Sequence, residues 1–170
     1  MLSKEVVKQI NDQINKEFYS AYFYLKIANY YTEHNLDGFA NWFLVQAKEE
    51  ESHGMLFVNY LQNNGESVVL QPIQVAEGSY KDFKEPLVDT LSHEESVTAS
   101  INSIYALALE NKEFRTTQFL EWFIKEQGEE EKSAEDLIKK YELFATDGKG
   151  LYLLDTELAA RVYTPPTLTL

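Results

Sequence analysis

The chain has 170 residues, of which 44% are hydrophobic, and it contains 7 glycines, 4 prolines and no cysteine. This length predicts a single domain. The composition is typical of an ordered, mostly helical protein rather than a disordered chain or a β-sandwich. The absence of cysteine excludes disulfides and thiolate metal sites. The net charge of −13 disfavours nucleic acid and anionic membranes as partners and attracts cations.

The first ten residues, MLSKEVVKQI, lack the apolar run of a signal peptide. No later stretch has enough consecutive apolar residues to cross a bilayer. We therefore expect a soluble, cytoplasmic protein with no membrane partner.

Four long helices are predicted, because four segments have helix-forming composition with almost no internal glycine or proline. These segments are residues 4–34, 37–64, 81–111 and 113–145. The links EHNLDG and ENKEF are short, so the helices on either side of each link should be antiparallel neighbours. The fold class predicted is an all-α antiparallel four-helix bundle.

The remaining segments complete this prediction. Residues 65–80 mix β-type residues with proline and lack a helical period, which indicates one long crossover between two helical hairpins. Two glycines in TDGKG are expected to end the fourth helix. A short fifth helix is predicted at about 152–162, followed by a tail at 163–170.

Each long helix carries an apolar stripe when it is read in alternating steps of four and three residues. Near the middle of every stripe the apolar side chains give way to acids, amides or a histidine. These interruptions are Glu17 in the first helix, Gln46, Glu50 and His53 in the second, Glu94 in the third, and Gln127 and Glu130 in the fourth.

The interruptions repeat along the chain. Glu17 and Glu50 are 33 residues apart, and so are Glu94 and Gln127, which gives the two hairpins a constant offset of 77 residues. Glu50-x-x-His53 therefore corresponds to a Gln-x-x-Glu pair in the second hairpin. Residues i and i+3 share one face of a helix, so each pair can hold one ion. Two matched hairpins would bring all these groups to one level of the bundle.

Buried carboxylates at one level require a compensating cation. An ionised carboxylate in an apolar interior costs several kcal/mol, roughly, unless it is paired or coordinated. The stripes contain no lysine or arginine, so a metal ion is predicted rather than a purely structural polar layer. One imidazole among carboxylates favours redox-active iron or manganese, although zinc or cobalt can occupy such a site in vitro.

At this point the chain resembles the ferritins, specifically the haem-free bacterial or archaeal type. The matching stretches are NKEFYSAYFY, AKEEESHG, LSHEES, EWFIKEQGEEEK and DGKGLYLLDTEL, and the resemblance extends in order over essentially the whole chain. The resemblance implies a ferritin-like bundle with one crossover and a short fifth helix. It also implies a closed homo-oligomeric shell of about two dozen subunits, in which Fe(II) is oxidised by O2 or hydrogen peroxide and stored as a ferric mineral.

The resemblance also implies a role for individual residues. It places the first iron between Glu17, Glu50 and His53, and the second at the bridging Glu50. The second iron would be completed by Glu94, Gln127 and Glu130, and a weaker third position would use Glu49, Glu126, Glu129 and Glu130. Tyr24 matches a tyrosine that supplies an electron. Since Gln127 and Glu130 replace the Glu and His of a symmetric di-iron bundle, the second ion should be held less tightly than the first.

The sequence does not match the haem-binding ferritins. Bacterioferritins bind haem through a methionine directly after the bridging Glu, and this chain has Glu51 there, so no haem is expected. Trp122 is predicted to pack near the site, and His93 is predicted to lie at the surface or to support Glu94. Two other functions share parts of the pattern: a di-iron or di-manganese oxidoreductase without storage, and a helical interaction bundle whose polar layer only fixes register.

Overall fold

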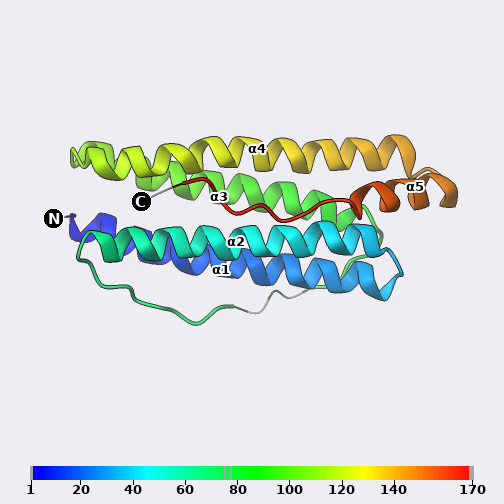
Figure 1. The fold of residues 1–170 in the computed structure, drawn as a ribbon, viewed down its shortest axis with the longest axis horizontal. Coiled ribbons are helices and arrows are strands. Elements are labelled where there is room, and N and C mark those ends of the chain that lie inside the picture. The colour runs from blue at the N-terminus through cyan, green and yellow to red at the C-terminus, as the bar shows by residue number, and fades with distance from the viewer. Residues whose placement is uncertain (1, 75, 77, 169–170) are drawn as a thin grey trace.

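The computed structural model describes residues 2–74, 76 and 78–168. It is all-α, and the helices formed by these residues are α1 (Lys4–Glu33), α2 (Asp37–Asn63), α3 (Glu85–Glu110), α4 (Phe114–Phe144) and α5 (Gly148–Leu158). α1 and α2 form one antiparallel hairpin and α3 and α4 form a second (Figure 1). The crossover between the hairpins runs along the outside of the first hairpin (Figure 1). The predicted fold class is confirmed.

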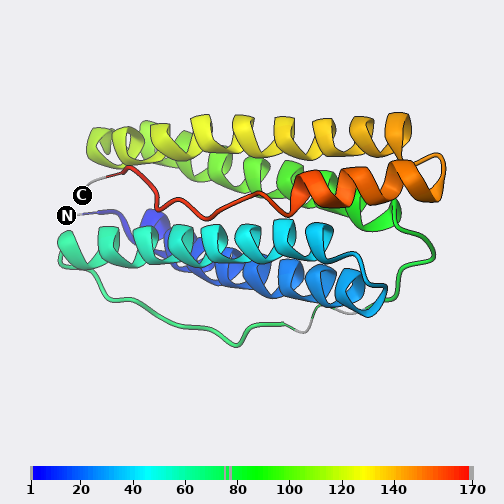
Figure 2. The ribbon, with the colours of Figure 1, turned by 45° about the vertical axis from the view of Figure 1, so that its right-hand side comes forward.

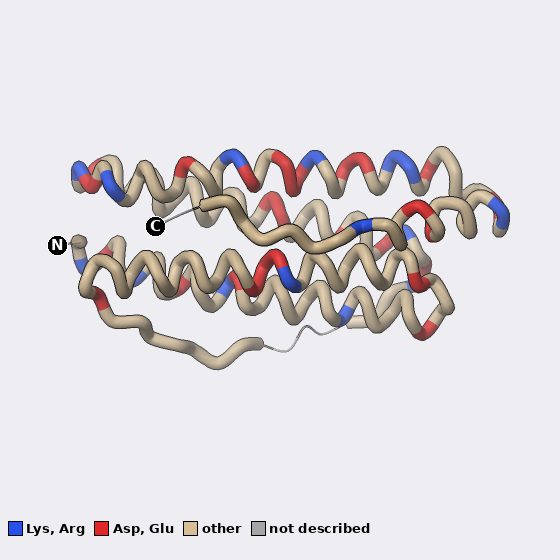
Figure 3. The backbone as a smooth tube through the Cα atoms, viewed as in Figure 1, with Lys and Arg blue, Asp and Glu red and all other residues tan. Residues whose placement is uncertain are grey.

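None of the helices in the described part of the chain is long and apolar enough to cross a membrane. Lysines and acidic residues alternate along much of α4 (Figure 3). Three such pairs lie one helical turn apart: Lys125–Glu129, Lys132–Asp136 and Glu135–Lys139. Solvent screens exposed pairs of this kind, so they support the helix without deciding the fold.

The third helix begins at Glu85, not at Lys81 as predicted. The side chain of Asp82 accepts hydrogen bonds of 2.9 Å from the backbone N–H groups of Lys84 and Glu85, which forms a turn before the helix. Pro86 then occupies the first helical turn, where its missing N–H has no cost. Because the Asp82 side chain bonds these backbone N–H groups in a turn, the helix begins later than predicted.

The fifth helix spans Gly148–Leu158 rather than 152–162. Asp147 caps it, because its Oδ1 accepts a 2.7 Å hydrogen bond from the Gly150 N–H, and an N-cap of this kind outweighs the low helix propensity of the glycines. Gly150 also lies against the end of α4. A Cβ there would be only 1.7 Å from the Phe144 carbonyl oxygen, so this glycine permits the close turn between the two helices.

α5 packs on the first turn of α2 and supplies the cap that α2 lacks. Leu36, at the N-cap position of α2, makes no side-chain capping bond. Instead the Asp155 carboxylate of α5 accepts a 3.0 Å hydrogen bond from the Phe39 N–H. The approach requires Gly38, since a Cβ at this position would lie 1.6 Å from the Asp155 carbonyl oxygen.

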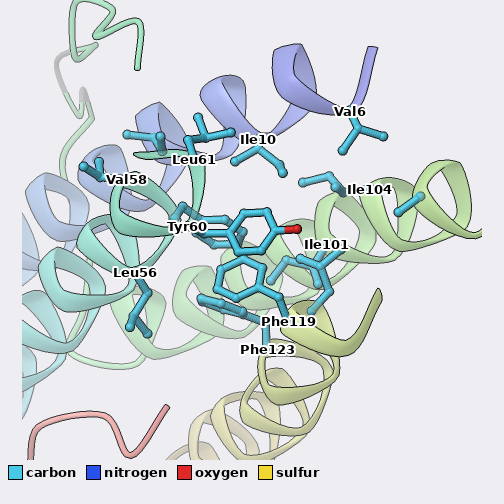
Figure 4. Close-up of a cluster of buried hydrophobic side chains, with 14 of the residues drawn as sticks. Val6, Ile10, Leu56, Val58, Tyr60, Leu61, Ile101, Ile104, Phe119 and Phe123 are labelled. Atoms are coloured by element: carbon cyan, nitrogen blue, oxygen red, sulfur yellow. The ribbon is translucent and has the colours of Figure 1, made fainter. Parts of the chain in front are cut away.

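Two apolar clusters fill the bundle. The first joins the beginnings of α1 and α4 to the ends of α2 and α3, with the aromatic rings of Tyr60, Phe119 and Phe123 at its centre (Figure 4). The second joins the second half of α1 to the first half of α2 and to α5, around Tyr31, Phe39 and Phe43. Both clusters are built of side chains with almost no exposed surface. The polar residues predicted from the stripes lie between them.

Candidate metal centre

The seven polar side chains that interrupt the stripes are 7% exposed or less: Glu17 on α1, Gln46, Glu50 and His53 on α2, Glu94 on α3, and Gln127 and Glu130 on α4. All four long helices contribute, as the repeat in the sequence predicts. Side chains of this type are rarely buried without partners. Their hydrogen bonds and charges therefore determine what the site can hold.

The first group consists of Glu17, Glu50 and His53. One ligand atom of each lies within 4.8 Å of the other two. Gln13 donates a 2.7 Å hydrogen bond to Glu17 Oε1, whereas Glu17 Oε2 is buried without a hydrogen-bond partner. Burial, reinforced by the charge of Glu50, raises the pKa of Glu17 well above its usual range. An unpartnered carboxylate oxygen beside a second acid and an imidazole fits a cation.

The second group consists of His53, Glu126 and Glu130, whose ligand atoms also lie within 4.8 Å of one another. Burial and the charge of Glu94 raise the pKa of Glu130 to about 8. The Gln46 amide of α2 donates to Glu130 Oε2 at 2.8 Å and to Glu50 Oε1 at 3.3 Å. His53 belongs to both groups, so the two positions are adjacent.

Glu94 is held by hydrogen bonds on both of its oxygens. The Tyr24 hydroxyl donates to Glu94 Oε1, and the Gln127 amide donates to Glu94 Oε2 at 3.1 Å. The same amide lies 3.3 Å from the Thr98 hydroxyl. Burial raises the pKa of Glu94, and these hydrogen bonds oppose the rise. Gln127 thus faces Glu94 with its nitrogen rather than its oxygen.

The three further acids implied by the resemblance lie at different depths. Glu126 is half-buried and belongs to the second group. Glu49 is also half-buried, but its Oε2 pairs with Arg161 at 2.5 Å. Glu129 is exposed and pairs with Lys125 at 3.2 Å. The structure therefore brings Glu126 to the buried groups and leaves Glu129 on the outer face of α4.

Two residues near the centre are not among those predicted from the sequence. Gln13 lies one turn before Glu17 with no exposed surface, and its position on the same face as Glu17 was a usable signal. Arg161 follows α5 and reaches Gln46 and Glu49 from outside the long helices. Arg161 is not part of any helical stripe, because only the tertiary path of the chain brings it to the metal centre.

His93 and Trp122 lie beside the centre. His93 Nε2 is 2.8 Å from the Ser20 hydroxyl, and burial lowers the pKa of His93 to about 4, so the ring is neutral near pH 7. His93 is half-buried and packs against Phe23. The Trp122 ring meets His53 edge to face with centroids 5.5 Å apart, an arrangement that limits the orientation of the imidazole.

Sequences and folds of known proteins show the family to which this chain belongs. The model of the ferritin-like domain matches residues 7–144. This chain belongs to the ferritins. The bacterial non-heme ferritin of Staphylococcus epidermidis is 37% identical over 163 residues, which are 96% of this chain and 98% of the relative. That of Campylobacter jejuni is 38% identical over 155 residues, covering 91% and 93%.

Solved ferritin structures have the same architecture. The crystal structure of an open-pore ferritin from Archaeoglobus fulgidus superimposes with a TM-score of 0.93 at 36% identity, and it covers 95% of this chain and 100% of its own. The predicted resemblance to haem-free prokaryotic ferritins is confirmed.

Proposed function

We propose that this ferritin oxidises Fe(II) at a di-iron ferroxidase centre within the subunit and stores the ferric product as a mineral. The observation that carries the proposal is the Glu17, Glu50 and His53 group, because an unpartnered buried carboxylate oxygen lies there between two apolar clusters. Family membership supports it, since the relatives are named bacterial non-heme ferritins. A cytoplasmic location remains a prediction.

In this proposal Glu17, Glu50 and His53 bind the first Fe(II). Glu50 also bridges to the second ion, which is completed by Glu130 and Glu94. Gln127 is a ligand of the second ion only if its amide turns so that the oxygen replaces the nitrogen now facing Glu94. The proximity of Glu126 to His53 and Glu130 supports Glu126 as a further ligand on the side of the second ion.

The chemistry follows from the ligand types. Two Fe(II) ions give one electron each to O2, which takes up two protons and becomes hydrogen peroxide. Peroxide then accepts one electron from each of two more Fe(II) ions and two further protons, which gives two molecules of water. Carboxylate oxygens favour the harder, more highly charged Fe(III) over Fe(II). Since Glu17, Glu50 and Glu130 hold protons more tightly than free acids do, binding of Fe(II) releases protons.

Tyr24 is proposed to supply an electron to the reaction. Its hydroxyl donates to Glu94, so the carboxylate is positioned to accept the phenolic proton when the ring loses an electron. Storage requires the closed shell of about two dozen subunits that the resemblance implies. The looser set of ligands at the second ion allows the Fe(III) product to leave for the mineral.

The test is aerobic oxidation of Fe(II), followed by the absorbance of Fe(III) in a stopped-flow instrument. We expect rapid oxidation by the wild type and a severe loss of rate in the Glu50→Ala/His53→Ala double variant. Glu51→Ala is the matched control, because Glu51 lies on the same helix but is exposed. Equal rates in the wild type and the double variant would overturn the proposal.

Storage is tested separately from oxidation. Native size-exclusion chromatography should give a shell, and iron added in excess of two per subunit should remain soluble inside it as a mineral. A monomer or dimer that retains stoichiometric metal and forms no mineral would instead indicate an oxidoreductase without storage.

A further inference from the structure

The segment after α5 forms a strap across the bundle. Residues 159–168, here called the strap, run back between α2 and α4 in both views (Figures 1 and 2). Asn41 of α2 donates hydrogen bonds to the carbonyl groups of Ala159 at 3.3 Å and of Arg161 at 3.0 Å. Farther along, the Tyr163 and Ser52 hydroxyls lie 2.7 Å apart. The strap is therefore fixed to α2 on either side of Arg161.

Arg161 extends from the strap to three residues of α2. Its Nη2 donates to Glu49 Oε2 at 2.5 Å and its Nη1 donates to Gln46 Oε1 at 2.9 Å. The guanidinium also lies over the Trp42 ring, 4.2 Å from its centroid. The Arg161 and Glu49 side chains are only 23% and 19% exposed. A charge held by a carboxylate, an amide and an aromatic face has a defined position.

Gln46 connects this arginine to the metal centre. Because a guanidinium only donates hydrogen bonds, the amide oxygen of Gln46 faces Arg161 and its nitrogen faces Glu130 and Glu50. Glu49 directly precedes the bridging Glu50 on α2, and its carboxylate lies close enough to that of Glu126 for the two charges to repel each other. Under the 77-residue repeat, Glu49 and Glu126 occupy equivalent positions of the two hairpins.

We propose that Arg161 is a specificity-determining residue of this centre, which neutralises Glu49 and keeps a third metal ion from binding between Glu49 and Glu126. The inference rests on the proposed function, because it concerns the same centre. A divalent ion placed beside Glu49 would face the fixed positive charge of Arg161. It would also lose one carboxylate ligand to that ion pair, so two ions per subunit bind and the third position stays closed while Arg161 is paired with Glu49.

A purely structural ion pair makes a different prediction. If Arg161 only fastened the strap to α2, its removal would lower stability and leave the number of bound ions unchanged. If the Arg161 guanidinium instead occupies the position of a third metal ion, removing it creates a third metal-binding site. Moving one unit charge away from a divalent ion a few ångströms distant changes the affinity by about tenfold or more, and a freed Glu49 ligand adds to this.

The experiment counts Zn(II), a redox-inert probe, bound by the apoprotein shell in equilibrium dialysis with elemental analysis. We expect two bound ions per subunit in the wild type, the second held less tightly than the first. In Arg161→Gln we expect a third, bound at least about tenfold more tightly than in the wild type. Glu49→Gln added to Arg161→Gln should return the count to two. Tyr163→Phe, which loses a strap contact but keeps Arg161, should match the wild type.

Arg161→Lys keeps a positive charge and covers the case in which Arg161→Gln fails to assemble. It should retain the wild-type count, and a third tight ion in this variant would contradict the charge argument. The inference is overturned if folded Arg161→Gln binds the same ions with the same affinities as the wild type, or if the extra ion persists without Glu49. Failure of the wild type to bind any ion tightly would instead contradict the proposed function. Anomalous diffraction from Zn(II)-soaked crystals should place the additional ion beside Glu49.

Discussion

Replacing Glu50 by glutamine should stabilise the metal-free protein in a pH-dependent way. Glu50 is 2% exposed, and burial together with the charges of Glu94 and Glu130 raises its pKa well above 4.5. The unfolded chain releases this proton near the ordinary value, whereas the folded protein retains it. The wild type therefore loses stability as the pH rises above 4.5, and it continues to lose stability until the folded pKa is reached. Glutamine does not titrate and avoids this loss.

The magnitude follows from the rise in the pKa of Glu50. Each unit by which the folded pKa exceeds the unfolded pKa costs about 1.4 kcal/mol once the pH is above both values. The substituted glutamine keeps the side-chain oxygen that accepts the hydrogen bond from Gln46 and has nearly the same volume. We expect Glu50→Gln to stabilise the apoprotein by more than about 1 kcal/mol near pH 7.5, and by less near pH 4.5, where the loss of stability in the wild type has only begun.

The assay is guanidinium unfolding of the chelator-treated protein at both pH values, at one protein concentration so that assembly contributes equally. Glu51→Gln, an exposed change on the same helix, should shift neither midpoint. Zn(II) should reverse the order of stability, because it binds the wild type more tightly than the variant. The same stabilisation at both pH values, or a variant less stable than the wild type near pH 7.5, would refute the reasoning.

Two further changes test single contacts. Tyr24→Phe removes the hydroxyl that donates to Glu94; Zn(II) binding should persist while stopped-flow Fe(II) oxidation slows severalfold, and an unchanged rate would exclude an electron-supplying role for the phenol. Gly38→Ala would place a methyl group 1.6 Å from the Asp155 carbonyl oxygen, so the denaturant midpoint should report a loss of about 1–3 kcal/mol. Gly128→Ala is its matched control, since a Cβ there meets no atom within 4 Å and should be neutral or stabilising. Equal midpoints for the two alanine variants would contradict the close packing of α5.

The buried polar layer was predictable from sequence because helical periodicity converts spacing directly into position. Glu17 and Glu50 interrupt apolar stripes, and the burial of both side chains agrees with that pattern. The roles of Gln127 and Glu129 do not follow in the same way. Side-chain rotation decides whether Gln127 offers its oxygen or its nitrogen, and a small angular offset on α4 places Glu129 with Lys125 on the exposed face. Their function as metal ligands remains a prediction.

The ends of helices and the contacts of irregular segments were harder to predict. The start of α3 depends on whether Asp82 caps a turn or joins the helix, and both outcomes suit the same residues. Arg161 illustrates a larger difficulty. Its contacts with Gln46 and Glu49 depend on the route of the strap across the bundle, and no local sequence pattern specifies that route.

The capping of α2 by α5 has a consequence for the motions of the subunit. The Phe39 amide hydrogen is bonded to Asp155, so it can exchange with solvent only when α5 moves away from α2. This amide is a built-in reporter of that opening, readable by hydrogen–deuterium exchange without any label. Glu50 and His53 lie several turns farther along the same helix. Comparing the rate of hydrogen–deuterium exchange at Phe39 with and without bound metal would therefore show whether metal binding at the centre also reduces the opening of α5 from α2.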